Sequence, residues 1–109
     1  MKNTIHIKKT INKFNKVLKI EGDKSLSIRW ALLASQATGK SISENLLKSE
    51  DVLNTLSCLK KLGVKVRFVK KRCEMIGVGL NGFIYKKNII LNAGNSGTFG
   101  RLILGLLVH

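Results

Sequence analysis

The spacing of hydrophobic and polar positions changes several times along this chain. Over residues 4–8 and 16–20, apolar side chains tend to alternate with polar ones, which is the spacing of a strand with one buried face. Over residues 25–38, apolar residues recur at every third or fourth position, as on one face of a helix, and Gly39 follows as a stop signal. These patterns predict two strands joined by a turn, followed by a helix.

The rest of the chain continues to exchange the two patterns. A second helix is expected to start after Ser49, because Glu50 and Asp51 would occupy a first turn in which the helix dipole favours acids. It would end at Gly63, and a last helix would run from about Gly97 to the end of the chain. Further strands are expected at residues 41–47, 64–69, 73–78 and 89–91. Strands that alternate with helices favour a layered α/β or α+β fold.

The last helix is apolar over most of its surface. Its side chains need a partner surface that the remainder of these 109 residues is not expected to supply: Leu102, Ile103, Leu106 and Leu107. We therefore expect the sequence to be the front part of a longer protein. The apolar run at residues 102–108 is too short to cross a bilayer, so no membrane partner is expected.

The chain is strongly basic, with 20 lysine and arginine residues against 6 acids and a net charge of +14. Its hydrophobic content of 44% is that of a globular domain. Three interpretations of the charge remain open: a solvated lysine-rich surface, a site for a small multiply charged anion, or a nucleic-acid surface. The last is the weakest, because aromatic residues do not alternate with the bases, and nucleic acid is not expected as a partner.

The two cysteines do not form a recognisable metal or redox pattern. Cys58 and Cys73 are too far apart for a CxxC motif, and both histidines are distant in sequence. We expect two buried thiols in a reduced, cytoplasmic protein, with no metal site.

Two glycine-containing loops each open into a predicted helix and place an arginine about one turn inside it. The first loop, EGDKSLSIR at residues 21–29, offers Lys24, the hydroxyl of Ser25, and Arg29. The free N–H groups and the dipole of a helix start bind phosphate or carboxylate. Because Ser25 and Arg29 are four residues apart, they share a helix face, and Arg29 would lean back toward the same anion.

The second loop, GNSGTFGR at residues 94–101, has the same plan with less charge. Asn95 offers a polar side chain, Gly97 would let the backbone approach a ligand closely, and Arg101 would lean back over the helix start. Two such sites would suit a reaction between two phosphorylated small molecules. A structural interpretation also stays open, in which Ser25 is only a helix N-cap and NSG is only a turn.

Four motifs follow one another between about Gly22 and Arg101: GDKSLSIR, NLLKSED, LGV and GNSGTFGR. In this order and spacing they resemble the enolpyruvylshikimate-phosphate synthase family, the 3-phosphoshikimate 1-carboxyvinyltransferases. The family pattern reads G-D/S-K-S-x-S-x-R, N-L-L-x-S-x-D, L-G-V and G-N-A-G-T-x-x-R. Several motifs in the right order are much more specific than either loop alone.

The resemblance implies a fold of two lobes, each built from three βαβαββ units, with the active site in the cleft between them. Residues 1–20 would hold N-terminal strands that pack with the second lobe. Residues 21–109 would hold the first repeat and the start of the second repeat of the N-terminal lobe.

The resemblance also implies a reaction of the shikimate pathway of aromatic amino-acid biosynthesis. The enolpyruvyl group of phosphoenolpyruvate would pass to the 5-hydroxyl of shikimate 3-phosphate, with release of phosphate and without a metal or organic cofactor. Lys24 would contact both substrates as the catalytic residue, and Ser25 and Arg29 would bind shikimate 3-phosphate. The phosphoenolpyruvate side would be lined by Asn95, Gly97 and Arg101. Alone, this chain is expected to be inactive without the remainder of its own protein.

Three positions depart from the family pattern. Glu21 stands where the family often has proline, and an acid there would oppose anion binding unless it points away. Ser96 replaces alanine, and Leu102 replaces a proline that would fix the helix start. Three other interpretations stay open: an enolpyruvyl transferase acting on a nucleotide sugar, a basic α/β module that binds RNA, or an inert truncated product.

Overall fold

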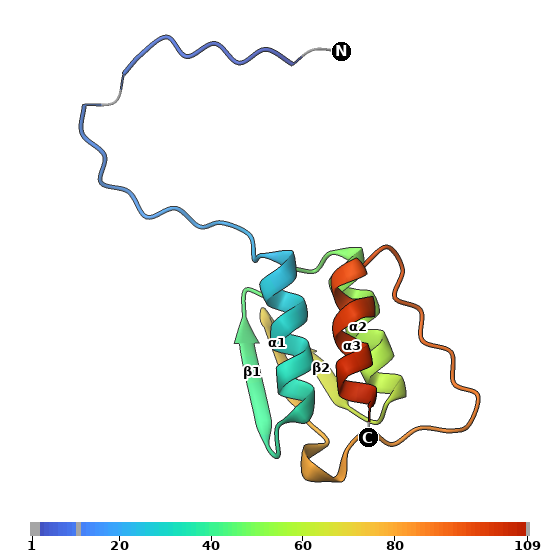
Figure 1. Ribbon diagram of the computed structural model, residues 1–109. Helices are drawn as coiled ribbons and strands as arrows, with labels where there is room; N and C mark the ends of the chain where they lie inside the picture. Colours follow the sequence, from blue (N-terminus) through green and yellow to red (C-terminus); the bar gives the residue numbers. More distant parts are fainter. Residues whose placement is uncertain (1–2, 11, 109) are drawn as a thin grey trace.

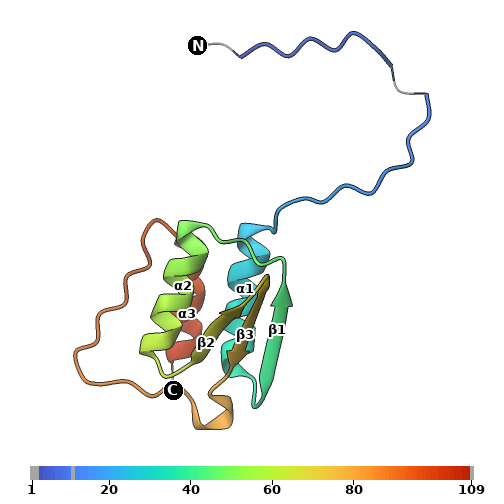
Figure 2. The same ribbon diagram turned by 180° about the vertical axis from the view of Figure 1, so that it is seen from behind.

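The computed structural model describes residues 3–10 and 12–108, in which helices cover one face of a small sheet (Figures 1 and 2). The elements are α1 (Lys24–Gln36), β1 (Lys40–Glu44), α2 (Glu50–Lys61), β2 (Lys65–Val69), β3 (Arg72–Ile76), a 3-10 turn η1 (Gly79–Asn81) and α3 (Gly97–Leu107). The mixed α/β fold is confirmed, and these helices and strands lie within three residues of their predicted bounds. Residues 1, 2, 11 and 109, which the predicted terminal segments include, lie outside the described residues.

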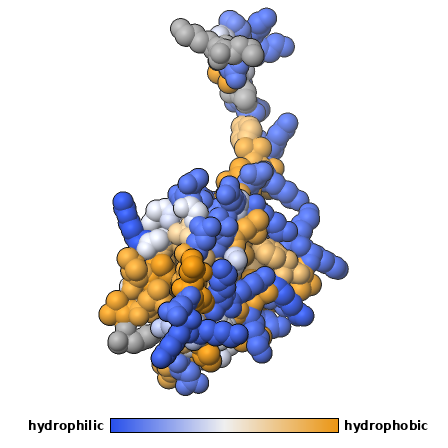
Figure 3. All heavy atoms as spheres, turned by 90° about the vertical axis from the view of Figure 1, so that its right-hand side faces the viewer, coloured by the Kyte–Doolittle hydropathy of each residue, from blue (hydrophilic) through white to orange (hydrophobic). Residues whose placement is uncertain are grey.

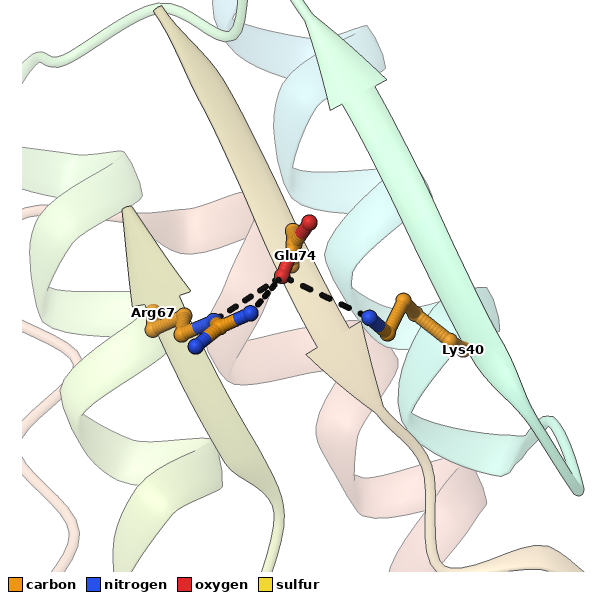
Figure 4. A network of polar contacts seen from close by, with 3 residues as sticks. All are labelled: Lys40, Arg67 and Glu74. Atoms are coloured by element: carbon orange, nitrogen blue, oxygen red, sulfur yellow. Dashed lines mark hydrogen bonds and ion pairs between the residues drawn. The ribbon is translucent and has the colours of Figure 1, made fainter. Parts of the chain in front are cut away.

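The sheet has the order β1-β3-β2, and β3 is antiparallel to both of its neighbours. Alternate residues of a strand point to opposite faces. Cys73 and Met75 of β3 are buried in the core, whereas Glu74 between them lies on the face away from the helices (Figure 4). β1 and β2 are therefore parallel to each other, and α2 connects them.

The hydrophobic core lies between the sheet and the helices. Each helix contributes one apolar stripe with helical spacing. The buried side chains on these stripes are Ile28, Ala31 and Leu32 of α1, Val52, Leu56 and Leu59 of α2, and Phe99 and Ile103 of α3. Because Phe99 and Ile103 are the buried residues of α3, they attach this last helix to the rest of the body.

The residues predicted as strands at 4–8 and 16–20 form no strand in the part of the chain that the structure describes, and their packing with the second lobe stays a prediction. This segment runs away from the folded body in an extended path (Figure 1), and Ile5 and Val17 are 87% and 94% exposed. An alternating pattern predicts that a segment fits a sheet, but a strand also needs hydrogen-bonding partners. A two-stranded hairpin on its own is marginal in water, so the pattern was not sufficient.

The strand predicted at residues 89–91 is also wrong. Residues 82–96, which we call the return segment, instead run without strand pairing and are held by α2. Three hydrogen bonds join the segment to α2 and to Leu62 after it: Ile84 N–H to the Leu62 carbonyl at 2.9 Å, Lys61 Nζ to the Ile90 carbonyl at 3.2 Å, and Cys58 Sγ to the Asn92 carbonyl at 3.2 Å. Because α2 and the residue after it supply these partners, the segment needs no sheet.

Candidate functional site

The three helices α1, α2 and α3 begin at the same end of the molecule and run in the same direction (Figures 1 and 2). After α1, strand β1 carries the chain back to this end, and the return segment does so before α3 (Figure 1). The two loops that the sequence singled out, at residues 21–29 and 94–101, therefore lie at one end of the fold. Helix N-termini carry partial positive charge, so this end of the fold favours anions.

A close backbone contact fixes the start of α1. A Cβ atom on Gly22 would overlap the carbonyl oxygen of Asn45 and lie 2.9 Å from the nitrogen of Leu47. The Asn45 side-chain amide donates to the Ile20 carbonyl at 3.1 Å, and the Leu47 N–H donates to the hydroxyl of Ser27 at 3.1 Å. The GDKS and NLL motifs therefore pack directly against each other, and this close packing leaves no room for a residue with a Cβ atom at position 22.

The N-cap of α1 is Asp23, whose carboxylate accepts a hydrogen bond from the Leu26 N–H at 2.7 Å. The interpretation of Ser25 as the N-cap is therefore wrong, and Ser25 stands partly exposed inside the first turn. Asp23 also occupies one of the N–H groups that an anion would use. Anion binding at this helix start consequently depends mainly on side chains, among which Arg29 is exposed one turn later.

Lys24 pairs with an acid that the sequence did not assign to the site. Its Nζ lies 3.2 Å from Oδ2 of Asp51, in the first turn of α2. From the sequence, Asp51 was expected only to complement the helix dipole. The signal that could have connected it with the site is its place as the last residue of the NLLKSED motif. The ion pair holds the ammonium group where α1 and α2 both begin.

The loop before α3 turns tightly around two residues. Ser96 is the N-cap, and its buried hydroxyl accepts a hydrogen bond from the Phe99 N–H at 3.1 Å. Gly94 has a φ of +57°, a conformation that favours glycine, and a Cβ atom there would lie 2.6 Å from the side-chain nitrogen of Asn54. The loop is thereby held close to α2.

The predicted ligand-binding residues of this second loop face solvent. Asn95, Gly97 and Arg101 are all exposed. A Cβ atom on Gly97 would meet no described atom within 4 Å, so the space beside its backbone is open. The structure thus places three predicted site residues at the start of α1 and three at the start of α3.

These helix starts form an open surface. None of the six predicted site residues lines either of two hollows that the described residues form. The first, of about 310 Å³, lies on the outer face of the sheet beside Arg67 and Glu74, and the second, of about 1020 Å³, lies between the β2–β3 turn and Asn45, next to the start of α1. A reaction that must exclude water needs a further part of the protein to cover the open surface at the helix starts.

A charged cluster lies on the face of the sheet away from the helices (Figure 4). Oε2 of Glu74 accepts hydrogen bonds from Nε and Nη2 of Arg67 at 2.9 and 2.8 Å, and Nζ of Lys40 lies 3.7 Å from the same oxygen. The Arg67 hydrogen bonds, supported by the charge of Lys40, hold the pKa of Glu74 below its ordinary value, although desolvation opposes them. The three residues belong to three strands, so this cluster ties the sheet together.

Hydrophobic side chains remain uncovered on α1, α2 and α3, and Figure 3 shows a broad hydrophobic patch on one side of the body. Leu26 and Leu33 of α1 are 64% and 75% exposed, and Leu102 and Leu104 of α3 are 43% and 63% exposed. The expectation that α3 is partly uncovered is confirmed, although Ile103 is buried. A surface of this kind marks a place where further protein packs.

Both cysteines are free and buried, and burial raises the pKa of the Cys58 and Cys73 thiols. Within residues 3–10 and 12–108, no group of three His, Cys, Asp or Glu side chains is placed to hold a metal ion. No helix of these residues combines the length and the apolar character that crossing a membrane requires.

From α1 to β3 the elements follow the order αβαββ, which is five of the six elements of a βαβαββ unit. The resemblance to the enolpyruvyl transferases implies a repeat unit of this kind. The sequence model of EPSP synthase (3-phosphoshikimate 1-carboxyvinyltransferase) matches residues 8–109, so the chain belongs to this family.

Relatives and solved structures agree with this assignment. The 3-phosphoshikimate 1-carboxyvinyltransferase of Persephonella marina is 42% identical over 104 residues, which cover 93% of this chain and 24% of that protein. That of Vesicomyosocius okutanii is 46% identical over 91 residues, which cover 83% of this chain and 20% of that protein. The structure of EPSP synthase from Acinetobacter baumannii superposes with a TM-score of 0.74 at 34% identity. The match covers 83% of this chain and 20% of that one. The chain thus spans about a fifth to a quarter of the length of the relatives that it matches.

Proposed function

We propose that the protein to which this chain belongs transfers the enolpyruvyl group of phosphoenolpyruvate to the 5-hydroxyl of shikimate 3-phosphate and releases phosphate. The observation that carries this proposal is the common end at which α1 and α3 begin, each with an exposed arginine one turn later. Two anionic substrates must meet in this reaction, and two neighbouring helix starts offer each of them backbone N–H groups and an exposed arginine.

The start of α1 is the proposed site for shikimate 3-phosphate. Arg29 offers a planar fork of donors to the phosphate group, and the hydroxyl of Ser25 adds a hydrogen bond. Lys24 contributes a compact positive charge between this substrate and phosphoenolpyruvate. As the reaction moves charge between the two substrates, a fixed ammonium group stabilises the transition state electrostatically.

The start of α3 is the proposed site for phosphoenolpyruvate. The open space beside Gly97 lets an anion approach the backbone, and Asn95 and Arg101 supply polar and charged donors. Because the proposed surface is open, the second lobe of the same protein would close it and supply the remaining groups. We also propose that the reaction takes place in the cytoplasm, since both thiols are free.

The test is phosphate release from phosphoenolpyruvate by the complete enzyme, measured with and without shikimate 3-phosphate. Release should depend on the second substrate, and Lys24→Ala should lower kcat by about 10²–10³-fold, which is typical for the loss of one transition-state donor. Lys60→Ala is the matched control, because Lys60 is exposed in the last turn of α2. Near-normal turnover by a folded Lys24→Ala enzyme would contradict the proposal.

A further inference from the structure

The ion pair between Lys24 and Asp51 joins a mobile group to a fixed one. The Asp51 side chain is 17% exposed and that of Lys24 is 50% exposed. Asp51 lies in the first turn of a regular helix, and its carbonyl accepts a hydrogen bond from the Thr55 hydroxyl at 2.9 Å. The positive end of the α2 dipole also favours a negative charge here. The backbone that carries this carboxylate is therefore fixed, and the side chain has less freedom than that of the lysine that pairs with it.

The contact changes the position of the lysine more than the stability of the fold. Exposed ion pairs contribute little to folding, because both side chains lose freedom and water screens the attraction. A lysine side chain has many rotamers, so a free Lys24 would distribute its ammonium group over a wide volume. Asp51 restricts that volume to the end of the fold where α1, α2 and α3 begin.

We propose that Asp51 is a positioning residue for Lys24, an inference that rests on the proposed function. Asp51 holds the ammonium group between the two substrate sites before either substrate binds. Such positioning acts on the rate, because a displacement of about 1 Å can cost 10²-fold in an enzymatic reaction. It need not improve substrate binding, since a carboxylate beside a lysine reduces the positive charge that the substrates experience.

This role predicts a separation of kcat from KM in the complete enzyme. Asp51→Asn should lower kcat at least about tenfold without raising KM for either substrate. Asp51→Glu keeps the charge and should retain more of kcat than Asp51→Asn does. Glu50→Gln is the matched control, because it removes the same charge from the same helix turn at an exposed position. It should leave kcat and KM unchanged.

A double variant tests whether Asp51 acts through Lys24. If it does, Lys24→Ala combined with Asp51→Asn should have the same kcat as Lys24→Ala alone, because the group to be positioned is already absent. Additive losses would overturn the proposal, and so would a higher KM with unchanged kcat. Equal losses in Asp51→Asn and Glu50→Gln would overturn it as well, since they would reflect general charge.

A measurement on the wild-type complete protein separates this inference from the proposed function. The order of the Lys24 ε-methylene group, from ¹³C relaxation, should exceed that of Lys60, and this difference requires neither catalysis nor a variant that folds. An absence of phosphate release would refute the proposed function alone. Equal disorder at Lys24 and Lys60 would refute the positioning role, whatever the activity.

Discussion

Replacing Gly22 with alanine should loosen the start of α1. The added Cβ atom would overlap the Asn45 carbonyl oxygen and lie 2.9 Å from the Leu47 nitrogen, and both neighbours are backbone atoms. Real Cβ atoms do not approach so closely, so the loop before α1 must move away from the turn after β1. That movement would stretch the hydrogen bond from the Asn45 side chain to the Ile20 carbonyl, which is 3.1 Å long.

The cost follows from these contacts. Overpacking typically costs about 1–3 kcal/mol, and a lost hydrogen bond contributes about 1 kcal/mol more. The Gly22→Ala substitution should therefore reduce the free energy of unfolding by about 2–4 kcal/mol. In the complete enzyme, kcat should also fall, because Lys24 begins the helix that is displaced.

Gly39→Ala is the control for this prediction. A Cβ atom on Gly39 would meet no described atom within 4 Å, and its φ is not in the left-handed region. This change should be neutral or stabilise the chain by up to about 1 kcal/mol, because alanine loses less backbone entropy on folding. Urea unfolding followed by circular dichroism measures both variants. Equal midpoints for Gly22→Ala and Gly39→Ala would refute the packing argument.

Three further outcomes are expected. In the complete enzyme, Arg29→Ala should weaken binding of shikimate 3-phosphate more than Arg29→Lys does, because lysine keeps the charge and loses the fork; equal effects by calorimetry would show that the fork is irrelevant. The isolated chain should bind a hydrophobic dye, because Leu33 and Leu104 are uncovered. It should release no phosphate, because one side of the active-site cleft does not position two substrates, and activity of the chain alone would contradict this expectation. The folded pKa of Glu74 is lowered, so its stabilising contribution is present above about pH 4.3, the ordinary glutamate value, and is lost as the pH falls through the folded pKa. Acid unfolding of Glu74→Gln should lack this component, and identical pH profiles for both proteins would contradict it.

The helices and the three strands of the sheet could be predicted because local and tertiary preferences agree there. Val52, Leu56 and Leu59 recur with helical spacing and are all buried. The predicted strands at residues 4–8, 16–20 and 89–91 are absent from the described structure, because pairing depends on partners that a local pattern does not specify. In the last case α2 provides the hydrogen-bonding partners instead of a neighbouring strand.

The helix positions of the candidate site residues could be predicted where a motif specifies both a residue type and a place on a helix, and their roles in binding stay predictions. Lys24 and Arg29 lie on α1 as expected, and the exposure of Arg101 follows from its place on α3. Two details depend on geometry. Asp23 caps the helix in place of Ser25, and Asp51 reaches Lys24 from a different helix. Neither contact can be read from spacing along one element, because a choice between two capping residues or a contact between two helices is decided by the packed structure.

The return segment gives the two halves of the proposed site different local stabilities. α1 and α2 pack on each other and on the sheet, whereas α3 is joined through Phe99 and Ile103 and through a segment bonded to α2 across 29 and 34 residues of sequence. Local opening of a protein releases cooperative units with few buried contacts first. Release of α3 with the return segment would leave α1 and the pair between Lys24 and Asp51 in place. A substrate at α1 would therefore meet a preformed site, whereas a substrate at α3 would itself help to hold the second half closed.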